Sequence, residues 1–433
     1  MILRLSDSLS RGLVVVAALL VGLWLSFFSV RAAIARHYSE GDKLKQLQTA
    51  VRLEPGNPDY WYILGRYQQY NLENPDAAAA EESYQKTIAL NPVATDAWLD
   101  LGTAYELDGR TGEAVAAYRA AKKSYPVSAD VSWRYGNFLL RQGEQQQAYA
   151  ELYRAIDADP ERSAAAFSRA YRTNPDINQL LVELLPAKQS VYVGVIQEAL
   201  NEQQLAVAKT VWARLMLLHP HLELRDVQTF DEHLLGAGEF AEARQVWDQG
   251  TATLPLPPLL QPRTSVVWDP SFESDIEGGS FAWRYVPISQ GVSVDLDKSE
   301  KLSGKQSLRV AFDGRHDPDI DAACILTVVQ PSTTYHFSGW VKSKALTSDE
   351  GVAFRLRPID DKGAPGTDVT TRQILGTNAW TVLEESLTSA RDVHRVQICV
   401  VRDASENPEA RISGAAWVDD VNLLPEPTEH RKP

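Results

Sequence analysis

The residues that could do chemistry are few. Asp419 and Asp420 adjoin near the C-terminus in AWVDDVNLL, a stretch that otherwise has the pattern of a buried β-strand. Neighbouring acids could be a catalytic pair, a metal site or a solvated strand end. Because successive side chains on a strand point to opposite faces, we expect the two carboxylates to face apart, which excludes a single acid–base pair.

No other pattern indicates catalysis. The eight histidines show no H-E-x-x-H spacing, and no G-x-S-x-G, P-loop or dinucleotide fingerprint occurs. A glycosidase needs two opposed carboxylates in a cleft, usually on a larger domain than any that is left over in this chain. We therefore expect a non-enzymatic protein with no catalytic residues.

The number of cysteines and the net charge exclude further classes of protein. Two cysteines, Cys324 and Cys399, exclude a disulfide scaffold and a zinc ribbon. One disulfide is an open possibility, but two separately buried thiols are the favoured interpretation. With 433 residues and a formal net charge of −14, we expect two or three domains and no nucleic-acid partner.

An uncharged stretch near the N-terminus indicates a membrane segment. Residues Gly12–Val30 carry no charge, and a helix of this length spans about 28 Å, close to the hydrocarbon core of a bilayer. A cleaved signal peptide is the competing interpretation, because Ala33-Ile34-Ala35 has the form of a cleavage site. The apolar run is long for a signal peptide and Arg31 lies within the would-be cleavage region. We therefore favour an uncleaved anchor over residues 12–34, after a short tail at 1–11.

A period of 34 residues organises the first half of the chain. Prolines recur at Pro92, Pro126 and Pro160, and Gly102 recurs as Gly136. The best unit reads DAWLDLGTAYELDGRTGEAVAAYRAAKKSYP, in which small residues let two antiparallel helices approach and a proline stops the second. This unit closely resembles the tetratricopeptide repeat (TPR) family, which implies an all-α solenoid. Looser units on both sides extend the predicted solenoid over residues 38–255.

The resemblance implies a concave face made by the first helix of each repeat. In such solenoids this face binds a protein partner. Carried over residue by residue, the partner-binding positions are Asp59, Tyr62, Arg66, Gln69, Leu99, Thr103, Glu106, Trp133, Asn137 and Arg141. A solvated face without a ligand is the competing interpretation.

The hydrophobic period changes from 3.6 to 2 beyond a proline-rich segment. LPLPPLLQP cannot continue a helix, and we expect a stiff linker over residues 256–264. Runs such as QSLRVAF and TYHFSGWVK then alternate polar and apolar residues between turn signals. They predict an all-β jelly-roll sandwich over residues 265–425, with a tail at 426–433.

The order of motifs in this region resembles the jelly-roll carbohydrate-binding modules of xylanases, from DPSFESD through SGKQSLRVAF and TTYHFSGWVKS to AWVDDVNLL. The resemblance implies one structural Ca²⁺, held by Glu273 and by Asp419 or Asp420. Oxygen ligands suit this hard cation, whereas acids that simply face water are the competing interpretation. Sugars stack on exposed aromatic faces beside polar groups, and the candidates here are Trp283, Tyr285, His336 and Trp340.

Together these features predict a multidomain adaptor of the cell envelope, with a transmembrane helix, a solenoid that binds a protein and a sandwich that binds polysaccharide or another envelope component. Exopolysaccharide assembly or export is a setting suggested by analogy. We expect a single-pass protein of a bacterial inner membrane with its C-terminal body in the periplasm, although Lys and Arg counts beside the span slightly favour the cytoplasm. A pure protein scaffold, with a structural β domain that binds no sugar, is the competing hypothesis.

Overall fold

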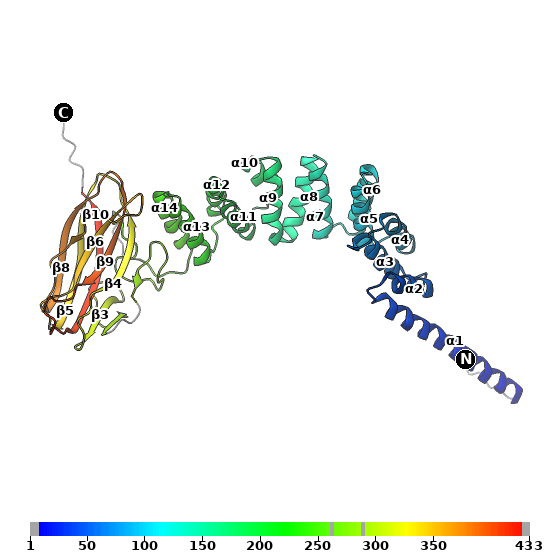
Figure 1. Cartoon of the computed structure of the whole chain (residues 1–433), viewed down its shortest axis with the longest axis horizontal. Helices are drawn as coiled ribbons and strands as arrows, with labels where there is room; N and C mark the ends of the chain where they lie inside the picture. The colour runs from blue at the N-terminus through cyan, green and yellow to red at the C-terminus, as the bar shows by residue number, and fades with distance from the viewer. Residues whose placement is uncertain (1–7, 260–263, 287–290, 427–433) are drawn as a thin grey trace. The chain divides into compact units, whose positions relative to one another are not determined.

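The structure is a computed structural model of the whole chain, and it describes residues 8–259, 264–286 and 291–426. Over these residues an all-α region of fourteen α-helices precedes a sandwich of two five-stranded β-sheets, which confirms the predicted fold class (Figure 1). Contacts divide the chain into two compact units, Met1–Val195 and Ile196–Pro433. Each unit is described by itself below.

The first helix, α1, spans Ser8–Ser39. Its segment Arg11–Ser39 is long and apolar enough to cross a membrane by length and composition, criteria that a signal sequence near an N-terminus also meets. None of its most apolar window is buried inside the protein. A surface of exposed leucine, valine and phenylalanine side chains of this extent is typical of a segment that is covered by something other than water.

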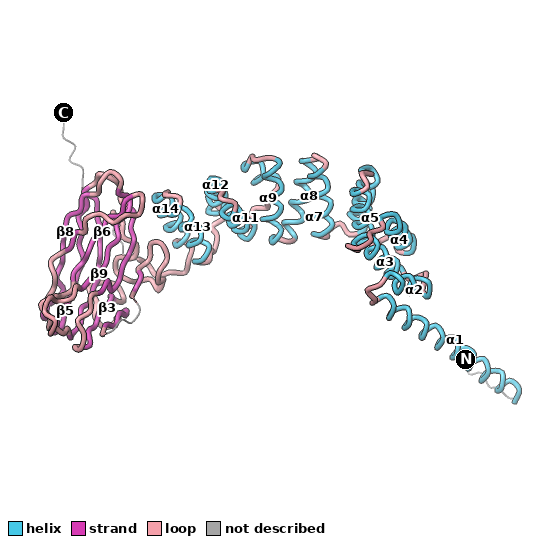
Figure 2. The backbone as a smooth tube through the Cα atoms, viewed as in Figure 1, coloured by secondary structure: helices cyan, strands magenta, loops and turns pink. Residues whose placement is uncertain are grey.

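Helical hairpins follow α1 in the first unit, as the cyan segments of the tube in Figure 2 show. Each hairpin packs its two helices antiparallel, with α3 against α4, α5 against α6 and α7 against α8. The helices that begin in this unit are α2 (Leu44–Leu53), α3 (Pro58–Tyr70), α4 (Ala77–Leu90), α5 (Thr95–Leu107), α6 (Thr111–Ser124), α7 (Ala129–Arg141), α8 (Gln145–Ala158), the 3-10 turn η1 (Pro160–Arg162), α9 (Ser163–Thr173), α10 (Ile177–Glu183) and α11 (Gln189–Asn201).

Small residues set the distance between paired helices, as the repeat pattern predicts. A Cβ atom on Gly102 of α5 would lie 3.2 Å from the ring of Tyr118 on α6, so any larger residue would have to displace this ring at the close approach of the two helices. The turn between them passes through Gly109, whose φ of +73° suits glycine. The repeat tryptophans Trp98 and Trp61 donate their indole N–H groups to the carbonyls of Pro92 and Pro55 over 3.0 and 2.9 Å, which ties the starts of α5 and α3 to the turns before them.

The second unit begins within α11 and continues with α12 (Leu205–Met216), α13 (Leu224–Gly236) and α14 (Phe240–Thr251). Its last hairpin packs directly on the sandwich. The rings of Trp247 and Trp268 meet with centroids 5.2 Å apart, and the Arg244 guanidinium donates to the carbonyl of Val266. The boundary between the two compact units therefore lies inside α11 and not at the proline-rich segment that was predicted to be a linker, residues 256–264. Residues 260–263 of that segment lie outside the described part.

The sandwich has two antiparallel sheets. Sheet A has the strand order β1-β4-β9-β6-β7 and sheet B the order β2-β3-β10-β5-β8. The strands are β1 (Arg284–Tyr285), β2 (Val292–Asp297), β3 (Ser307–Asp313), β4 (Ile320–Val328), β5 (Thr334–Leu346), β6 (Ala353–Asp360), β7 (Val369–Thr370), β8 (Gly376–Thr388), β9 (Val393–Arg402) and β10 (Ser413–Pro425). The jelly-roll crossovers bring β10, the last strand, between β3 and β5 in the middle of sheet B.

The core lies between the inner faces of the two sheets. On β5 the buried residues Tyr335, Phe337 and Val341 alternate with half-buried polar ones. The ring of Phe337 meets that of Phe354 from sheet A with centroids 5.0 Å apart. A Cβ atom on Gly339 would lie 2.5 Å from the Phe354 ring, so glycine at this strand position makes room for the aromatic pair.

Candidate functional site

Asp100, on α5, is the centre of a polar cluster that joins the first helices of three repeats. Its carboxylate accepts hydrogen bonds from the Tyr62 hydroxyl over 2.9 Å and from the Arg134 guanidinium over 2.7 Å. The Arg66 guanidinium lies 3.8 Å away. Burial first, and then the Asp100 charge, raise the pKa of Tyr62, so its hydroxyl remains a donor to this carboxylate at neutral pH.

The other residues predicted to bind a protein partner, on the concave face of the first helices that is called the groove below, lie in different surroundings. Glu106 accepts two hydrogen bonds from Arg141, over 2.6 and 2.8 Å. Thr103 shares a hydrogen bond of 3.1 Å with Tyr118, Gln69 accepts from Tyr84 over 2.6 Å, and Asp59 lies in the first turn of α3. Leu99 is 1% exposed and belongs to the core between helices, so its prediction as a partner contact is wrong.

The groove continues around Trp133, on α7. The guanidinium carbons of Arg169 and Arg162 lie 4.8 and 5.4 Å from the centre of the indole ring, within the range of cation–π attraction. Asn137 donates to the backbone carbonyl of Trp133 over 2.7 Å and accepts from Arg169 over 2.5 Å. Trp133 thus lies beside two cations.

Sequence reasoning missed the charged partners in this groove, namely Asp100, Arg134, Arg162 and Arg169. One signal in the sequence could have identified two of these residues. Asp100 and Arg134 are 34 residues apart, which places opposite charges at the same position of adjacent repeats. Charges that alternate at the repeat period can pair across neighbouring helices, because each repeat contacts the next in the same way.

On the sandwich, the predicted sugar-binding residues do not converge. Trp283 is 1% exposed, donates its indole N–H to the carbonyl of Asp269 over 2.9 Å and packs on Phe272. It is a core residue, and its prediction as a sugar-stacking residue is wrong. Tyr285 lies half-buried on β1, the edge strand of sheet A, where burial raises the pKa of its hydroxyl.

His336 and Trp340 lie on β5, on the side of sheet B that faces away from the core. Both are less than fully buried, and the His336 imidazole lies 3.3 Å from the Glu384 carboxylate on β8. These two residues share one face of the molecule because they are separated by an even number of strand positions. Tyr285 belongs to the other sheet, so it cannot complete the same site.

A concave pocket of about 620 Å³ lies on this side of sheet B. Trp417 of β10 lines it and donates its indole N–H to Asp297 over 2.8 Å. Lys342 of β5 pairs with Glu300 over 2.5 Å, and its ammonium lies 5.9 Å from the centre of the Trp417 ring. Hydrogen bonds from Ser299 and then from Trp417 hold the pKa of Asp297 at about 2, so this carboxylate is charged at all physiological pH values.

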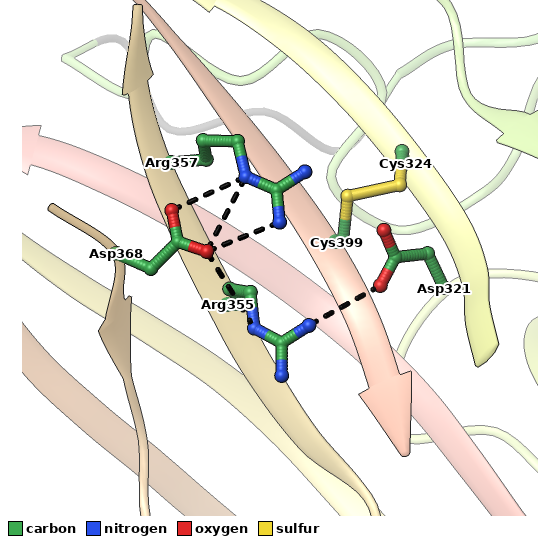
Figure 3. Close-up of a disulfide and its surroundings, with 6 residues drawn as sticks. All are labelled: Asp321, Cys324, Arg355, Arg357, Asp368 and Cys399. Atoms are coloured by element: carbon green, nitrogen blue, oxygen red, sulfur yellow. Dashed lines mark hydrogen bonds and ion pairs between the residues drawn. A yellow bond between two sulfur atoms is a disulfide. The ribbon is translucent and has the colours of Figure 1, made fainter. Parts of the chain in front are cut away.

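The outward side of sheet A carries a disulfide and paired charges in place of aromatic rings (Figure 3). Cys324 on β4 and Cys399 on β9 are direct cross-strand partners and form a disulfide, so the interpretation of two separate thiols is wrong. Beside it, Arg355 reaches both Asp321 and Asp368, and Arg357 binds Asp368 over 3.1 Å. These guanidinium groups are already neutralised by carboxylates of the same sheet face.

The carboxylates predicted to hold calcium gather around the loop that precedes β3. Glu273 accepts from the backbone N–H of Lys305 over 2.8 Å, and Asp419 accepts from those of Leu302 and Ser303 over 2.8 and 3.0 Å. Asp420 accepts from the hydroxyl of Ser303 over 2.8 Å. The predicted residues therefore do lie around one loop, although they come from opposite ends of the domain.

Backbone geometry overturns the expectation that Asp419 and Asp420 face apart. The pairing of β10 with β5 shifts register between Asp419 and Asn422, and Asp420 has a φ of +49°. A β-bulge of this kind breaks the alternation of side chains. Both carboxylates consequently bind the loop at Ser303, although each is occupied by donors of the protein.

These contacts bear on the calcium prediction. A cation site needs several oxygens directed at one point, whereas the oxygens of Glu273 and Asp419 named above face N–H donors. Among the described residues, Asp321, Cys324 and Cys399 are the one group of three potential ligands within 4.8 Å of one another, and their two sulfurs form a disulfide. The calcium site stays a prediction, tested by a calcium-dependent rise in melting temperature that Glu273→Ala removes.

Comparison with protein families assigns both regions. A tetratricopeptide repeat model matches residues 69–129 and 108–176, and a carbohydrate binding domain model matches residues 265–406. A curated relative, the BBSome complex member bbs-4 of Caenorhabditis elegans, is 30% identical over 129 residues. The match covers 28% of this chain and 28% of that protein.

Solved structures resemble the two regions separately. The TPR protein YrrB, described as having an unusual peptide-binding site, is 14% identical, with 49% of this chain and 93% of that chain covered and a TM-score of 0.27. A xylan-binding domain of carbohydrate-binding module family 22 is 17% identical, with 38% and 97% covered and a TM-score of 0.27. The chain therefore joins tetratricopeptide repeats in its N-terminal part to a β-sandwich of the carbohydrate-binding-domain type in its C-terminal part.

Proposed function

We propose that this chain is a non-enzymatic, membrane-anchored adaptor of the bacterial cell envelope. The observation that carries the proposal is the presence, behind one long apolar helix, of two kinds of binding module that have no catalytic role of their own. The repeats bind a protein partner through the groove of α3, α5, α7 and α9, and the sandwich binds polysaccharide. Exopolysaccharide assembly or export is the setting that combines both ligands.

The disulfide supports a location outside the cytoplasm. Cytosolic reductants keep thiols reduced, whereas disulfides persist in the periplasm and other oxidising compartments. Cys324 and Cys399 are the two cysteines of the chain and they pair with each other. With α1 as the anchor, the repeats and the sandwich would both lie on the periplasmic side of the inner membrane.

A topology experiment tests this location. Alkaline phosphatase, which is active only outside the cytoplasm, is fused to the C-terminus of the full chain in a Gram-negative host, and a fluorescent protein that matures only in the cytoplasm serves as the matched fusion. The phosphatase fusion should be active and the fluorescent fusion dark. The thiols of the unfused chain should resist maleimide until a reductant is added. The reverse pattern would place the body in the cytoplasm.

The pocket on sheet B is the proposed polysaccharide site. Charged or amide groups of Asp297, Lys342 and Asn378 line it, and the buried Trp417 forms part of its wall. Trp340 lies outside this lining, two positions from Lys342 on the same face of β5, and its half-buried ring is the more accessible one. Aromatic faces stack on sugar rings while polar groups bind the hydroxyls, and a pocket of about 620 Å³ is within the size range of ligand sites.

Affinity electrophoresis of the detergent-solubilised chain tests the sugar site. Gels contain soluble xylan, a cellulose derivative or an acidic bacterial exopolysaccharide. At least one of these should retard the native chain, Trp340→Ala should lose most of the retardation, and Tyr285→Ala on sheet A should retain it. If none of the polysaccharides retards the native chain, the pure protein scaffold is correct. The burial of Trp283 and the paired charges on sheet A are the observations that favour this second function.

A further inference from the structure

Arg169, on α9, differs from the other arginines that line the repeat groove. Arg66 and Arg134 both lie against the Asp100 carboxylate, and Arg141 pairs with Glu106. Arg162 pairs with Asp159 over 2.8 Å. In the described part of the chain, the hydrogen-bond partner of Arg169 is the neutral amide of Asn137, and no carboxylate forms an ion pair with it.

The guanidinium of Arg169 is nevertheless held in place. Asn137, which is 5% exposed, is fixed by its own hydrogen bond to the carbonyl of Trp133 and accepts one N–H of Arg169. The indole ring of Trp133 lies 4.8 Å from the guanidinium carbon. An arginine carries five N–H donors, and this arrangement uses one of them. The remaining donors are available to a ligand on a side chain that is already oriented.

Two further arginines, Arg141 and Arg172, lie near Arg169. Arg141, with 56% of its side chain exposed, and Arg172 lie close enough that their charges, after burial, lower the pKa of Arg169. A partly desolvated guanidinium whose hydrogen-bond partner is a neutral amide is stabilised by an added anion more than a fully hydrated surface arginine is.

We propose that the partner of the repeat groove is an acidic extended peptide, one of whose Asp or Glu carboxylates binds Arg169 while a neighbouring side chain packs on Trp133. Arginine and a carboxylate form paired N–H to oxygen hydrogen bonds, which explains why the free donors of Arg169 suit this ligand better than an apolar helix. This inference rests on the proposed function of the repeats as a binding module and names the chemistry of their partner.

Peptide selection against the full chain in lipid nanodiscs tests the proposal. The probe is a library of random 12-residue peptides displayed on their own coding RNA. Three proteins are compared, namely the native chain, Arg169→Glu in the groove and Arg119→Glu, which makes the same charge change at an exposed position of α6. Both substitutions lie on exposed positions, and circular dichroism confirms that both variants fold.

Peptides selected by the native chain should be enriched in Asp and Glu, and the enrichment should persist with Arg119→Glu and disappear with Arg169→Glu. A synthetic copy of the best peptide should bind Arg169→Glu about 10- to 100-fold more weakly than the native chain, the range expected for a lost charged hydrogen bond. Selection of peptides without acidic residues would overturn the proposal while leaving the binding function intact. If no peptide is selected, both the acidic-peptide proposal and the proposed protein-binding function of the repeats are wrong.

Discussion

Two buried carboxylates, one in each compact unit, are stabilised in different ways. Asp100 in the repeats is 3% exposed and lies against the guanidinium groups of Arg134 and Arg66. Asp419 in the sandwich is fully buried, and among the described residues it accepts hydrogen bonds from the backbone N–H groups of Leu302, Ser303 and Asp420. The first acid is balanced by opposite charge and the second by dipoles alone.

The difference follows from how each fold brings distant residues together. In a solenoid a residue meets its counterpart one repeat later, so an arginine 34 positions away can pair with Asp100. In the jelly roll the last strand meets a loop more than 100 residues earlier, and that loop turns its backbone toward the bulge at Asp419. Burial raises the pKa of Asp419 to about 6, and the hydrogen bonds from Ser303 and Leu302 only partly offset it.

Removal of the carboxylate at Asp100 should have the largest effect on stability. Asp100→Ala leaves the partly buried Arg134 without its anion and Tyr62 without its acceptor. Loss of one partner of a buried pair costs about 3–5 kcal/mol. Hydrogen exchange of α3, α5 and α7 in the full chain should rise, whereas Glu113→Ala, at an exposed ion pair, should change it little. Equal protection in the two variants would show that the cluster contributes no net stability.

Removal of the carboxylate at Asp419 should have the next largest effect, confined to the second unit. Asp419→Ala leaves the N–H groups of Leu302 and Ser303 without an acceptor inside the protein. Buried donors that lose their acceptor cost about 1–3 kcal/mol, less the part recovered if the loop opens to water. Exchange at residues 302–306 should rise before that of the remaining strands. Asp419→Asn, which keeps an acceptor oxygen, should recover part of the loss.

The two units should also differ in their response to pH. Burial raises the pKa of Asp231 to about 7 and that of Asp269 and Asp419 to about 6. Asp231 on α13 is fully buried, accepts from Ser280 over 3.0 Å and leaves its other oxygen without a hydrogen bond. A carboxyl whose pKa is higher in the folded than in the unfolded state stabilises the fold below pH ~4, and this contribution is lost as pH rises through the folded value.

The second unit should therefore lose stability between pH 5 and pH 8, by on the order of 2 kcal/mol for Asp231 alone. Asp297, with a pKa of about 2, stays ionised over this range and adds nothing to the change of the free energy of unfolding with pH. Chemical denaturation of the full chain at several pH values measures the slope, which Asp231→Asn should reduce and the exposed Glu242→Gln should not. If the free energy of unfolding of Asp231→Asn changes with pH as much as that of the native chain, the ionisation of Asp231 does not destabilise the fold.

Much of the fold was predictable because it depends on local, repeated patterns. The glycine and proline spacing predicts the hairpins, and Gly102 does lie against Tyr118. Alternation along TYHFSGWVK predicts the two faces of β5, including the outward position of Trp340. Both patterns are read within one element, where the period alone decides which side chains are buried.

The parts that sequence reasoning missed depend on non-local geometry. Trp283 lies in an irregular segment without a period, so its burial against Phe272 could not be inferred from spacing. Alternation failed at Asp420 because a bulge changes the register. The disulfide required knowledge that β4 and β9 are neighbours with Cys324 opposite Cys399, which the linear order of strands does not reveal.

The smallest effect on stability is expected from the loss of the ion pair between Arg141 and Glu106 in the groove. Arg141 binds Glu106 through two hydrogen bonds, as Arg134 binds Asp100 through one, but 56% of its side chain is exposed. Exposed pairs contribute about 0–1 kcal/mol because water and salt screen them. Arg141→Ala should therefore change the denaturation midpoint only slightly, and less at 0.5 M salt than at 0.05 M. A loss as large as that of Asp100→Ala would mean that the groove is closed to solvent, and the distinction between a buried and an exposed charge pair in the repeats would fail.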